Sequence, residues 1–502
     1  MTVDTPISMD DRVHDVTCAD LCCAWLRCRA LTAWKQLVAG ARPTIFRRMT
    51  PVEDSKRGKY IPGLKPGGVT EPRTAAALIL ADLRTGSMLE PAFEKRIAGL
   101  DARDRRWIQE LVWGTLRVRG WLDAVLAVRI RGGLARLDAD LTDLLRLGAY
   151  QLLFMGSVPP YAAIGQSVEL TKRRHGIGAS KLANAVLRRI DRERDSLEPT
   201  VPVDPIEAIA QKYSHPRWLV ARWMARWSEA DVIKLLIANN AEAPIIVRPF
   251  GVVREQLEAM LEGAGVSVLE IPLVPDSLQL SAGVALTELG AFKQGLFFVQ
   301  DPGATLVARY AAVPVGAVVA DLCAAPGGKA LEMSRTAKTV LACDAKAVRV
   351  DRMMLGIGRV DARNVLVVIA DAIKPAIKPV DVVLVDVPCT GTGTFRRHPD
   401  ARWRLKVSDF AVMGALQKGI LRAAATVVKP GGLLVYSTCS LEPEENDQQV
   451  DAFLATHPDF TLETPPARAV ADEVLDDGRL RVLPQRHGVD GAFAARLRRK
   501  VS

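Results

Sequence analysis

Three hydrophobic patterns follow one another along the chain. From residue 73 to about 200, apolar residues recur at three- and four-residue spacings, as at Ile108, Leu111 and Val112. This spacing places apolar side chains on one face of a helix. No alternating segment interrupts it. We therefore predict a compact all-α domain over residues 73–200.

A proline-rich break between Pro199 and Pro205 separates this domain from shorter elements. A tryptophan-rich helix comes first, and its large side chains are predicted to lie in a core. Short apolar runs at 245–247, 266–271 and 296–299 are typical of strands, and residues 253–261 are typical of a helix. We predict a small α+β linking module over residues 205–300.

From about residue 315 strand-like and helical stretches alternate, which indicates a doubly wound, Rossmann-type α/β sheet within a domain over residues 301–500. The strand-like runs end at acids or at a cysteine: Asp321, Asp344, Asp371, Asp386 and Cys439. Because ligands bind beyond the carboxyl ends of parallel strands, we predict a nucleotide-like ligand at this edge.

The chain of 502 residues carries 67 Lys+Arg against 57 Asp+Glu, a net charge of +10. This excess favours a polyanionic partner such as nucleic acid. The sequence has neither an apolar run of membrane-spanning length nor a secretory signal pattern, so we predict a cytoplasmic protein with reduced thiols. Nothing in it requires an obligate protein partner, and we predict a monomer.

Residues 1–72 differ from the rest of the chain. They hold four cysteines, Cys18, Cys22, Cys23 and Cys28, and end in a Pro/Gly/Lys-rich stretch. The cysteine spacing matches no two-plus-two zinc pattern, so no metal site is predicted. We predict a disordered extension that ends in a linker.

The end of the predicted helical domain is basic. Its cations include Lys172, Arg173 and Arg174 and outnumber the nearby acids. A solvated helix face is the alternative interpretation, but the size of the excess favours contact with nucleic acid.

A loop of small residues follows the first strand of the sheet and precedes a helix: Cys323-Ala324-Ala325-Pro326-Gly327-Gly328-Lys329. Small residues let the backbone approach a ligand, and the helix offers free N–H groups. Asp344 is placed to accept hydrogen bonds from a ribose diol. The loop lacks both the dinucleotide G-x-G-x-x-G and the Gly-Lys-Ser/Thr of a P-loop. By elimination S-adenosylmethionine is the leading ligand, with Asp371 near its adenine amino group.

Two cysteine motifs also follow strand-like runs. Asp386-Val387-Pro388-Cys389 comes after residues 382–385, and Ser437-Thr438-Cys439-Ser440 comes after residues 433–436. At the edge of a parallel sheet these groups are candidates for nucleophilic catalysis. Two buried structural cysteines are the alternative, and burial statistics alone favour it.

Taken together, these motifs resemble those of the Sun-type (Fmu) RNA cytosine-5 methyltransferases, in particular the bacterial 16S rRNA methyltransferase B group. The resemblance also rests on Arg396-Arg397-His398-Pro399-Asp400 and Pro443-Glu444-Glu445-Asn446. In that family a domain resembling the antitermination factor NusB precedes a small linking module and a Rossmann-type methyltransferase domain. The resemblance covers nearly all of the chain after residue 72.

The resemblance implies methylation of carbon 5 of a cytosine in small-subunit ribosomal RNA with S-adenosylmethionine. The loop Cys323–Lys329, with Asp344, Asp371 and Asp386, would line the cofactor site. Cys439 would be the nucleophile and Cys389 would help to release the product. We hypothesise that protonated Asp386 stabilises N3 of the base during the addition. One departure is Val247-Arg248-Pro249-Phe250, where family members often carry Arg-x-Asn.

The segment between the two cysteines is basic and aromatic. Residues 395–406 include Arg396, Arg397 and Arg402 but a single acid, Asp400. We predict that it grips RNA phosphates beside an unpaired or flipped-out cytosine. A mobile loop with solvated charges is the alternative.

Two other functions stay open at this point. DNA cytosine methyltransferases use the Pro-Cys cysteine as nucleophile, which would make Cys389 the attacking group. A non-catalytic ribosome-assembly factor would be expected to have lost a cysteine or the cofactor loop, and the sequence keeps both.

Overall fold

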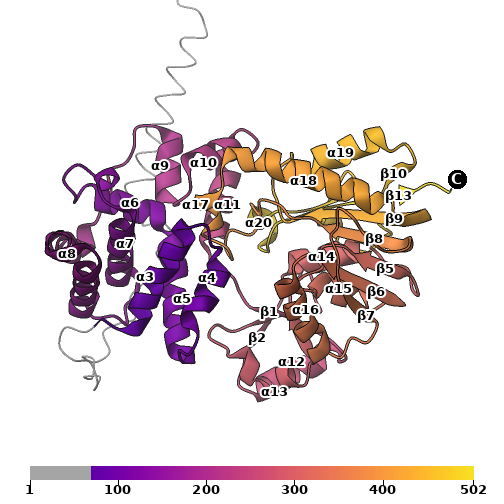
Figure 1. Ribbon diagram of the computed structural model, residues 1–502, viewed down its shortest axis with the longest axis horizontal. Helices are drawn as coiled ribbons and strands as arrows, with labels where there is room; N and C mark the ends of the chain where they lie inside the picture. Colours follow the sequence, from indigo (N-terminus) through magenta and orange to yellow (C-terminus); the bar gives the residue numbers. More distant parts are fainter. Residues whose placement is uncertain (1–68, 502) are drawn as a thin grey trace, which may run out of the picture. The chain divides into compact units, whose positions relative to one another are not determined.

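The computed structural model of the chain describes residues 69–501 (Figure 1). The predicted disordered extension and its four cysteines therefore lie outside the described residues, apart from 69–72. There, helix α3 already begins at Glu71. Within residues 69–501, no helix combines the length and the apolar character needed to cross a membrane.

The first part of the described chain is helical, as its periodicity predicts. Asp101 and Asp138 each accept a backbone N–H at a helix start, which satisfies groups that the helix cannot bond itself. Ile108, Leu111 and Leu145 lie in one buried core. The helices are α3 (Glu71–Arg84), α4 (Leu89–Ile97), α5 (Ala102–Arg117), α6 (Arg119–Ala127), α7 (Ala139–Phe154) and α8 (Pro160–Arg192), the last kinked at Gly176.

A short helical bridge and a small sheet come next. The helices are α9 (Pro205–Lys212), α10 (Arg217–Met224) and α11 (Glu229–Asn240). Of the tryptophans predicted to lie in a core, Trp223 of α10 is fully buried, whereas Trp218 and Trp227 are only partly buried. The sheet is antiparallel in the order β2-β3-β1-β4. Its elements are β1 (Ile246–Pro249), α12 (Arg254–Gly263), β2 (Val268–Glu270), β3 (Leu278–Leu280), α13 (Gly290–Lys293) and β4 (Phe297–Val299). The sequence analysis did not identify β3.

The remainder of the chain builds a nine-stranded sheet. Its parallel part runs in the order β7-β6-β5-β8-β9, and β10 to β13 extend it with antiparallel pairs that the sequence analysis did not predict. Its strands are β5 (Val318–Asp321), β6 (Thr339–Asp344), β7 (Val365–Ile369), β8 (Val380–Asp386), β9 (Val428–Thr438), β10 (Phe460–Glu463), β11 (Leu475–Asp476), β12 (Arg479–Val482) and β13 (Ala492–Arg499). Its helices are α14 (Pro302–Tyr310), α15 (Gly328–Met333), α16 (Ala347–Arg359), α17 (Ala401–Arg404), α18 (Val407–Ala425), α19 (Asp447–Thr456) and α20 (Pro484–His487).

Both faces of this sheet are buried. Along β8, Val382 and Leu384 pack into one core, whereas Val383 and Val385 pack into another. Alternate side chains of a strand point to opposite faces, so a continuous apolar run requires cover on both sides. Figure 1 shows helices on either side of the strands. The Rossmann-type fold, preceded by an all-α domain and a small α+β module, is confirmed.

The chain reverses direction across the sheet beside β5. Strands β6 and β7 lie on one side of β5, whereas β8 and β9 lie on the other. The carboxyl ends of β5 and β8 therefore flank a topological switch point, the place where open α/β sheets bind ligands. Asp321 ends β5 and Asp386 ends β8.

Candidate active site

Two thiols meet at the carboxyl edge of the parallel strands. Strands β8 and β9 pair in parallel, with Asp386 opposite Ser437, so the loops that follow them leave the sheet together. The Sγ atoms of Cys389 and Cys439 lie 3.2 Å apart. The sequence analysis predicted that these two residues act together, and the fold brings them into contact.

The two thiols are not equivalent. Its hydrogen bond to Cys439 raises the pKa of Cys389 well above its usual range, and burial and the charges of Cys439, Glu445 and Asp386 act in the same direction. Either thiol can supply the hydrogen of this contact. Burial, with nearby Asp321, also raises the pKa values of Cys323 and of Cys343, the latter to about 12. Neither is suited to act as a nucleophile.

One buried carboxylate joins the two cysteine loops. Glu445 accepts hydrogen bonds from the backbone N–H of Thr390 at 2.9 Å and from its hydroxyl. It also accepts from Ser440 Oγ at 2.5 Å and from Gln417 Nε2 at 2.9 Å. Thr390 follows one cysteine and Ser440 follows the other, so Glu445 fixes the spacing of the thiols. The sequence analysis quoted Glu445 within a motif but assigned it no role.

A partly buried ion pair lies at the same edge of the sheet. Lys329 Nζ donates to Asp386 Oδ2 at 2.7 Å, and Ser437 Oγ donates to Asp386 Oδ1 at 2.8 Å. Burial alone lowers the pKa of Lys329, but the charge and hydrogen bond of Asp386, with Asp321, outweigh it and the pKa is raised. Lys329, predicted to line the cofactor site, therefore also places a positive charge at the edge of the sheet where the two thiols lie.

The loop after β5 has the features of a cofactor cradle. Gly327 has φ +105°, and a Cβ there would meet Met353 at 3.0 Å, while a Cβ on Gly328 would meet Gln300 at 2.8 Å. Among residues 69–501, the buried Oδ2 of Asp321 has no hydrogen-bond partner. Burial, with the charge of Asp386, raises the pKa of Asp321 to about 7. An unsatisfied carboxylate at a switch point fits the α-ammonium group of S-adenosylmethionine. The sequence analysis noted Asp321 as a strand end at the start of the cofactor loop and assigned it no contact with the ligand.

Two other predicted cofactor residues lie at the ends of the next strands. Asp344 is buried at the end of β6, where Arg349 Nη2 lies 3.3 Å from its Oδ2. Asp371 is exposed just after β7 and accepts the backbone N–H of Ile373. Both positions suit an adenosine moiety that extends from the switch point along the sheet edge.

The structure corrects the prediction for the arginines between the two cysteines. Arg396 is buried and donates to Asp301 at 2.8 Å and to Asp490 at 2.5 Å. Arg397 pairs with the same two acids. Arg402 is fully buried and donates to Asn240 Oδ1 at 2.5 Å. The prediction that Arg396 and Arg402 contact RNA phosphates is wrong, because their guanidinium groups hydrogen-bond to other groups of the protein. The guanidinium group of Arg397 is paired in the same way.

The other basic candidates have different surroundings. Lys172 is exposed on α8, Arg173 lies 3.0 Å from Glu169, and Arg174 donates to Asp140 at 2.7 Å. Their contact with RNA stays a prediction. Arg248, in the segment that departs from the family pattern, is fully buried and lies 2.6 Å from Glu332. Its role is structural.

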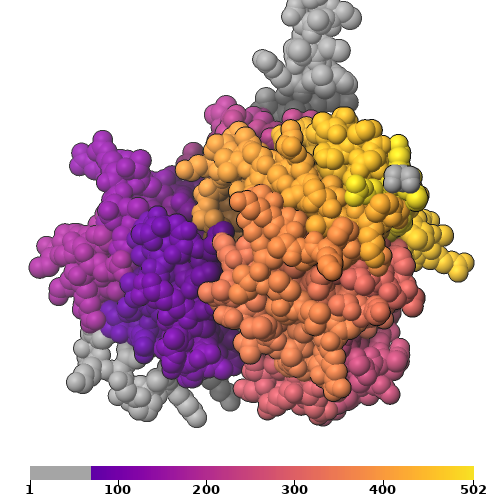
Figure 2. Space-filling view, turned by 45° about the vertical axis from the view of Figure 1, so that its right-hand side comes forward, coloured from indigo at the N-terminus to yellow at the C-terminus, as the bar shows by residue number. Residues whose placement is uncertain are grey.

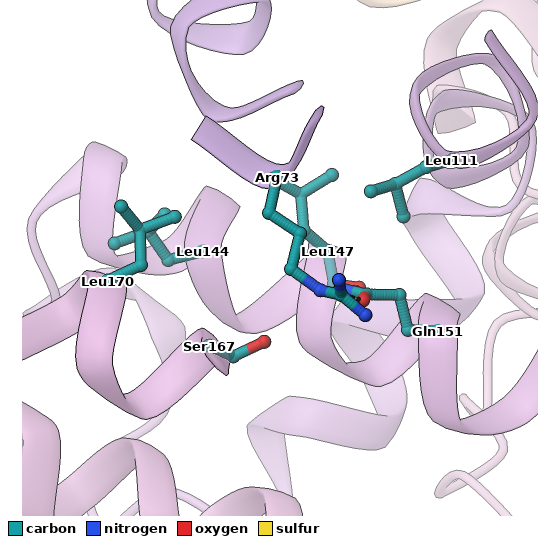
Figure 3. Close-up of a pocket in the computed structure, with 7 residues that line it drawn as sticks. All are labelled: Arg73, Leu111, Leu144, Leu147, Gln151, Ser167 and Leu170. Carbon is teal, nitrogen blue, oxygen red and sulfur yellow. Dashed lines mark hydrogen bonds between the residues drawn. The ribbon is translucent and has the colours of Figure 1, made fainter. Parts of the chain in front are cut away.

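A small cavity lies within the helical domain (Figure 3). Its free volume of about 10 Å³ holds one water molecule at most. Arg73 crosses it and donates to Gln151 at 2.7 Å. The cavity is therefore a packing defect and no ligand site.

The fold and the site together define a Rossmann-type methyltransferase with a pair of cysteines in contact at the edge of its sheet. Family models match in the order of the observed parts: the NusB family at residues 70–192, the RsmF/B-like ferredoxin-like domain at 215–287, and the 16S rRNA methyltransferase RsmB/F at 314–498.

Curated relatives match over most of their length. The probable ribosomal RNA small subunit methyltransferase B of Synechocystis sp. is 32% identical over 85% of this chain and 99% of its own. The ribosomal RNA small subunit methyltransferase B of Pseudomonas putida is 34% identical over 85% of this chain and 98% of its own. The chain belongs to the RsmB/F family of small-subunit ribosomal RNA methyltransferases. It is an enzyme that uses S-adenosylmethionine and acts on ribosomal RNA.

Solved structures agree with this assignment. The crystal structure of PH0851 aligns with a TM-score of 0.71 and 26% identity, covering 87% of this chain and 99% of that one. NSun6 from Pyrococcus horikoshii aligns with a TM-score of 0.51 and 21% identity, covering 57% of this chain and 98% of that one, and supports the fold alone.

We expect Asp344→Asn to weaken binding of S-adenosylmethionine. The substitution removes a charged acceptor for the ribose diol, a loss that corresponds to about 10-fold or more in Kd. Isothermal titration with the folded variant measures the change. Asp351→Asn, on the exposed face of α16, is the matched control and should bind as the wild type does. Equal Kd values for Asp344→Asn and the wild type would exclude the assignment.

Proposed function

We propose that this enzyme methylates carbon 5 of a cytosine in 16S ribosomal RNA through a covalent adduct between Cys439 and C6. The observation that carries the proposal is the 3.2 Å contact between Cys389 and Cys439 beside the Asp386–Lys329 pair. Methylation at an amino group or a ribose hydroxyl needs no thiol. Methylation at a pyrimidine carbon needs a nucleophile to activate the ring and a base to restore it.

Cys439 is the nucleophile in this proposal. Its thiolate adds to C6, and the electron pair of the ring shifts toward C5 and N3. N3 takes up a proton that Asp386 delivers. Because the resting pair is the Lys329 ammonium and the Asp386 carboxylate, this proton first passes from Lys329 to Asp386 across their 2.7 Å hydrogen bond, and Lys329 is left as the neutral amine. The resulting enamine is nucleophilic at C5. S-adenosylmethionine supplies an electrophilic methyl group for this carbon. The assignment of the nucleophilic role to Cys439 rests on the resemblance of Ser437-Thr438-Cys439-Ser440 to the family motif.

Release of the product needs a base. The C5 proton must leave before the Sγ–C6 bond breaks and Cys439 departs as thiolate. Cys389 lies next to the adduct and is the candidate acceptor, directly or through water. Adduct formation converts Cys439 to a thioether, which removes its charge and weakens the hydrogen bond that raises the pKa of Cys389 in the free enzyme. The Cys389 thiol can then lose its proton to solvent, and its thiolate accepts the C5 proton.

The nucleoside formed tests the proposal. Wild-type enzyme, small-subunit rRNA transcript and methyl-labelled S-adenosylmethionine are incubated, and the RNA is digested and analysed by mass spectrometry. We expect the label in 5-methylcytidine. Label in an N-methylated or 2′-O-methylated nucleoside would contradict it. A parallel reaction with small-subunit particles establishes which form of the RNA is the substrate.

Other features of the function stay predictions. Lys172, Arg173 and Arg174 are proposed to contact RNA from the NusB-like domain. The domain limits at residues 72, 200 and 300, the monomeric state and the cytoplasmic location are predicted from the sequence.

A further inference from the structure

Helix α4 of the NusB-like domain contacts the methyltransferase domain through two acids. Glu90 Oε1 lies 2.6 Å from His398 Nδ1, and Glu94 pairs with Arg352 of α16. Residues four apart lie on the same face of a helix, so both acids point the same way. In the space-filling view the indigo surface of the helical domain borders the orange surface of the methyltransferase domain around a hollow (Figure 2).

His398 is tied to the loop of the nucleophile. The backbone N–H of His398 donates to Thr394 at 3.1 Å, and the neighbouring Gly393 N–H donates to the carbonyl of Cys439 at 2.9 Å. The charge of Cys439 is among the interactions that raise the pKa of His398. The side chains of His398 and Glu90 are 42% and 43% exposed. Within the described part of the chain, Nε2 of His398 has no hydrogen-bond partner, so only its Nδ1 is held by Glu90.

The surroundings of His398 favour its charged form. Burial alone lowers the pKa of His398, but the hydrogen bond and charge of Glu90, with Asp400 and Cys439, outweigh it and the pKa is raised. Arg404 also interacts with Glu90, whose pKa is lowered by His398 and Arg404 despite burial. Below its raised pKa the imidazolium persists, and above it the positive charge beside Cys439 is lost.

We propose that Glu90 is a positioning residue that holds His398 as an imidazolium beside Cys439, so that the NusB-like domain completes the electrostatic environment of the nucleophile. The imidazolium attracts the thiolate and favours loss of the thiol proton to solvent. Lys329 provides a second cation near Cys439. The inference rests on the proposed role of Cys439 as nucleophile. It also gives the helical domain a part in the chemistry in addition to RNA contact.

The pH dependence of Cys439 alkylation tests the proposal without requiring turnover. Full-length wild type, Glu90→Gln, His398→Gln and the double variant react with iodoacetamide between pH 5.5 and 9.5, and peptide mapping separates Cys439 from Cys389. We expect Glu90→Gln and His398→Gln to slow alkylation of Cys439 near pH 7 by about 3- to 10-fold and to move its midpoint to higher pH. The double variant should show no further shift, because both changes remove the same charge.

Glu94→Gln is the matched control, since it breaks the contact of α4 with Arg352 and leaves His398 untouched. It should keep the wild-type alkylation profile. The proposal is overturned if Glu90→Gln or His398→Gln keeps the wild-type alkylation profile, or if Glu94→Gln shifts it equally. None of these outcomes affects the assignment of Cys439, which the alanine variants below test separately.

Discussion

Replacement of Cys439 with alanine is expected to reduce methyl transfer by about 10³-fold or more, because the ring of cytosine is then not activated. Cys389→Ala should behave differently. It retains the nucleophile but lacks the group that accepts the C5 proton, so a protein–RNA adduct should accumulate. The measurement is methyl transfer to small-subunit rRNA with labelled S-adenosylmethionine, followed by a denaturing gel that retains covalent adducts.

The double variant Cys439→Ala/Cys389→Ala is the control and should be inactive without an adduct. The opposite pattern, with Cys389→Ala inactive and Cys439→Ala trapped on RNA, would reverse the two roles. The chemistry would then be that of the DNA cytosine enzymes. The contact of 3.2 Å between the thiols permits either pattern, and the motif Thr438-Cys439, on which the sequence analysis based the nucleophile, favours the first.

Loss of the Glu442 carboxylate is expected to have the largest effect on stability. Glu442 is fully buried and accepts hydrogen bonds from Arg222 at 2.5 Å, Arg226 at 3.0 Å and Trp223 at 2.9 Å. Arg222 and Trp223 belong to α10 and Arg226 follows it, about 220 positions earlier in the chain, so Glu442 joins the helical bridge to the Cys439 loop. Glu442→Ala removes the buried acceptor of Arg222, Arg226 and Trp223. Because Arg222 keeps Glu444 and Arg226 keeps the carbonyl of Leu441, we expect a cost of about 2–3 kcal/mol. Urea unfolding followed by tryptophan fluorescence measures the change.

Glu444→Ala is the matched control. Glu444 also pairs with Arg222, but its side chain is 37% exposed. An exposed pair of this kind contributes about 0–1 kcal/mol. If Glu442→Ala costs no more than Glu444→Ala, the carboxylate is not the element that holds α10 against the methyltransferase domain.

The sequence by itself determined the order of the domains and which residues lie at the ends of the parallel strands. Helical spacing at Ile108 and Leu111, and strand-like runs that end at Asp321, Asp386 and Cys439, are local properties that each segment carries with it. In a parallel sheet all strand ends meet at one edge, so a pattern read along the chain places these residues together in space. Their pairing was therefore predictable without coordinates.

Only the tertiary structure decided which charges are available to a substrate. Arg396 and Arg402 have the composition of an RNA-binding segment, yet Asp301, Asp490 and Asn240 occupy their donors inside the protein. The contacts of His398 with Glu90, and of Arg222 with Glu442, likewise join residues more than 200 positions apart. The spacing of residues along the chain does not predict such partners. The free energy of a buried charge depends on the groups that lie next to it only after the chain has folded.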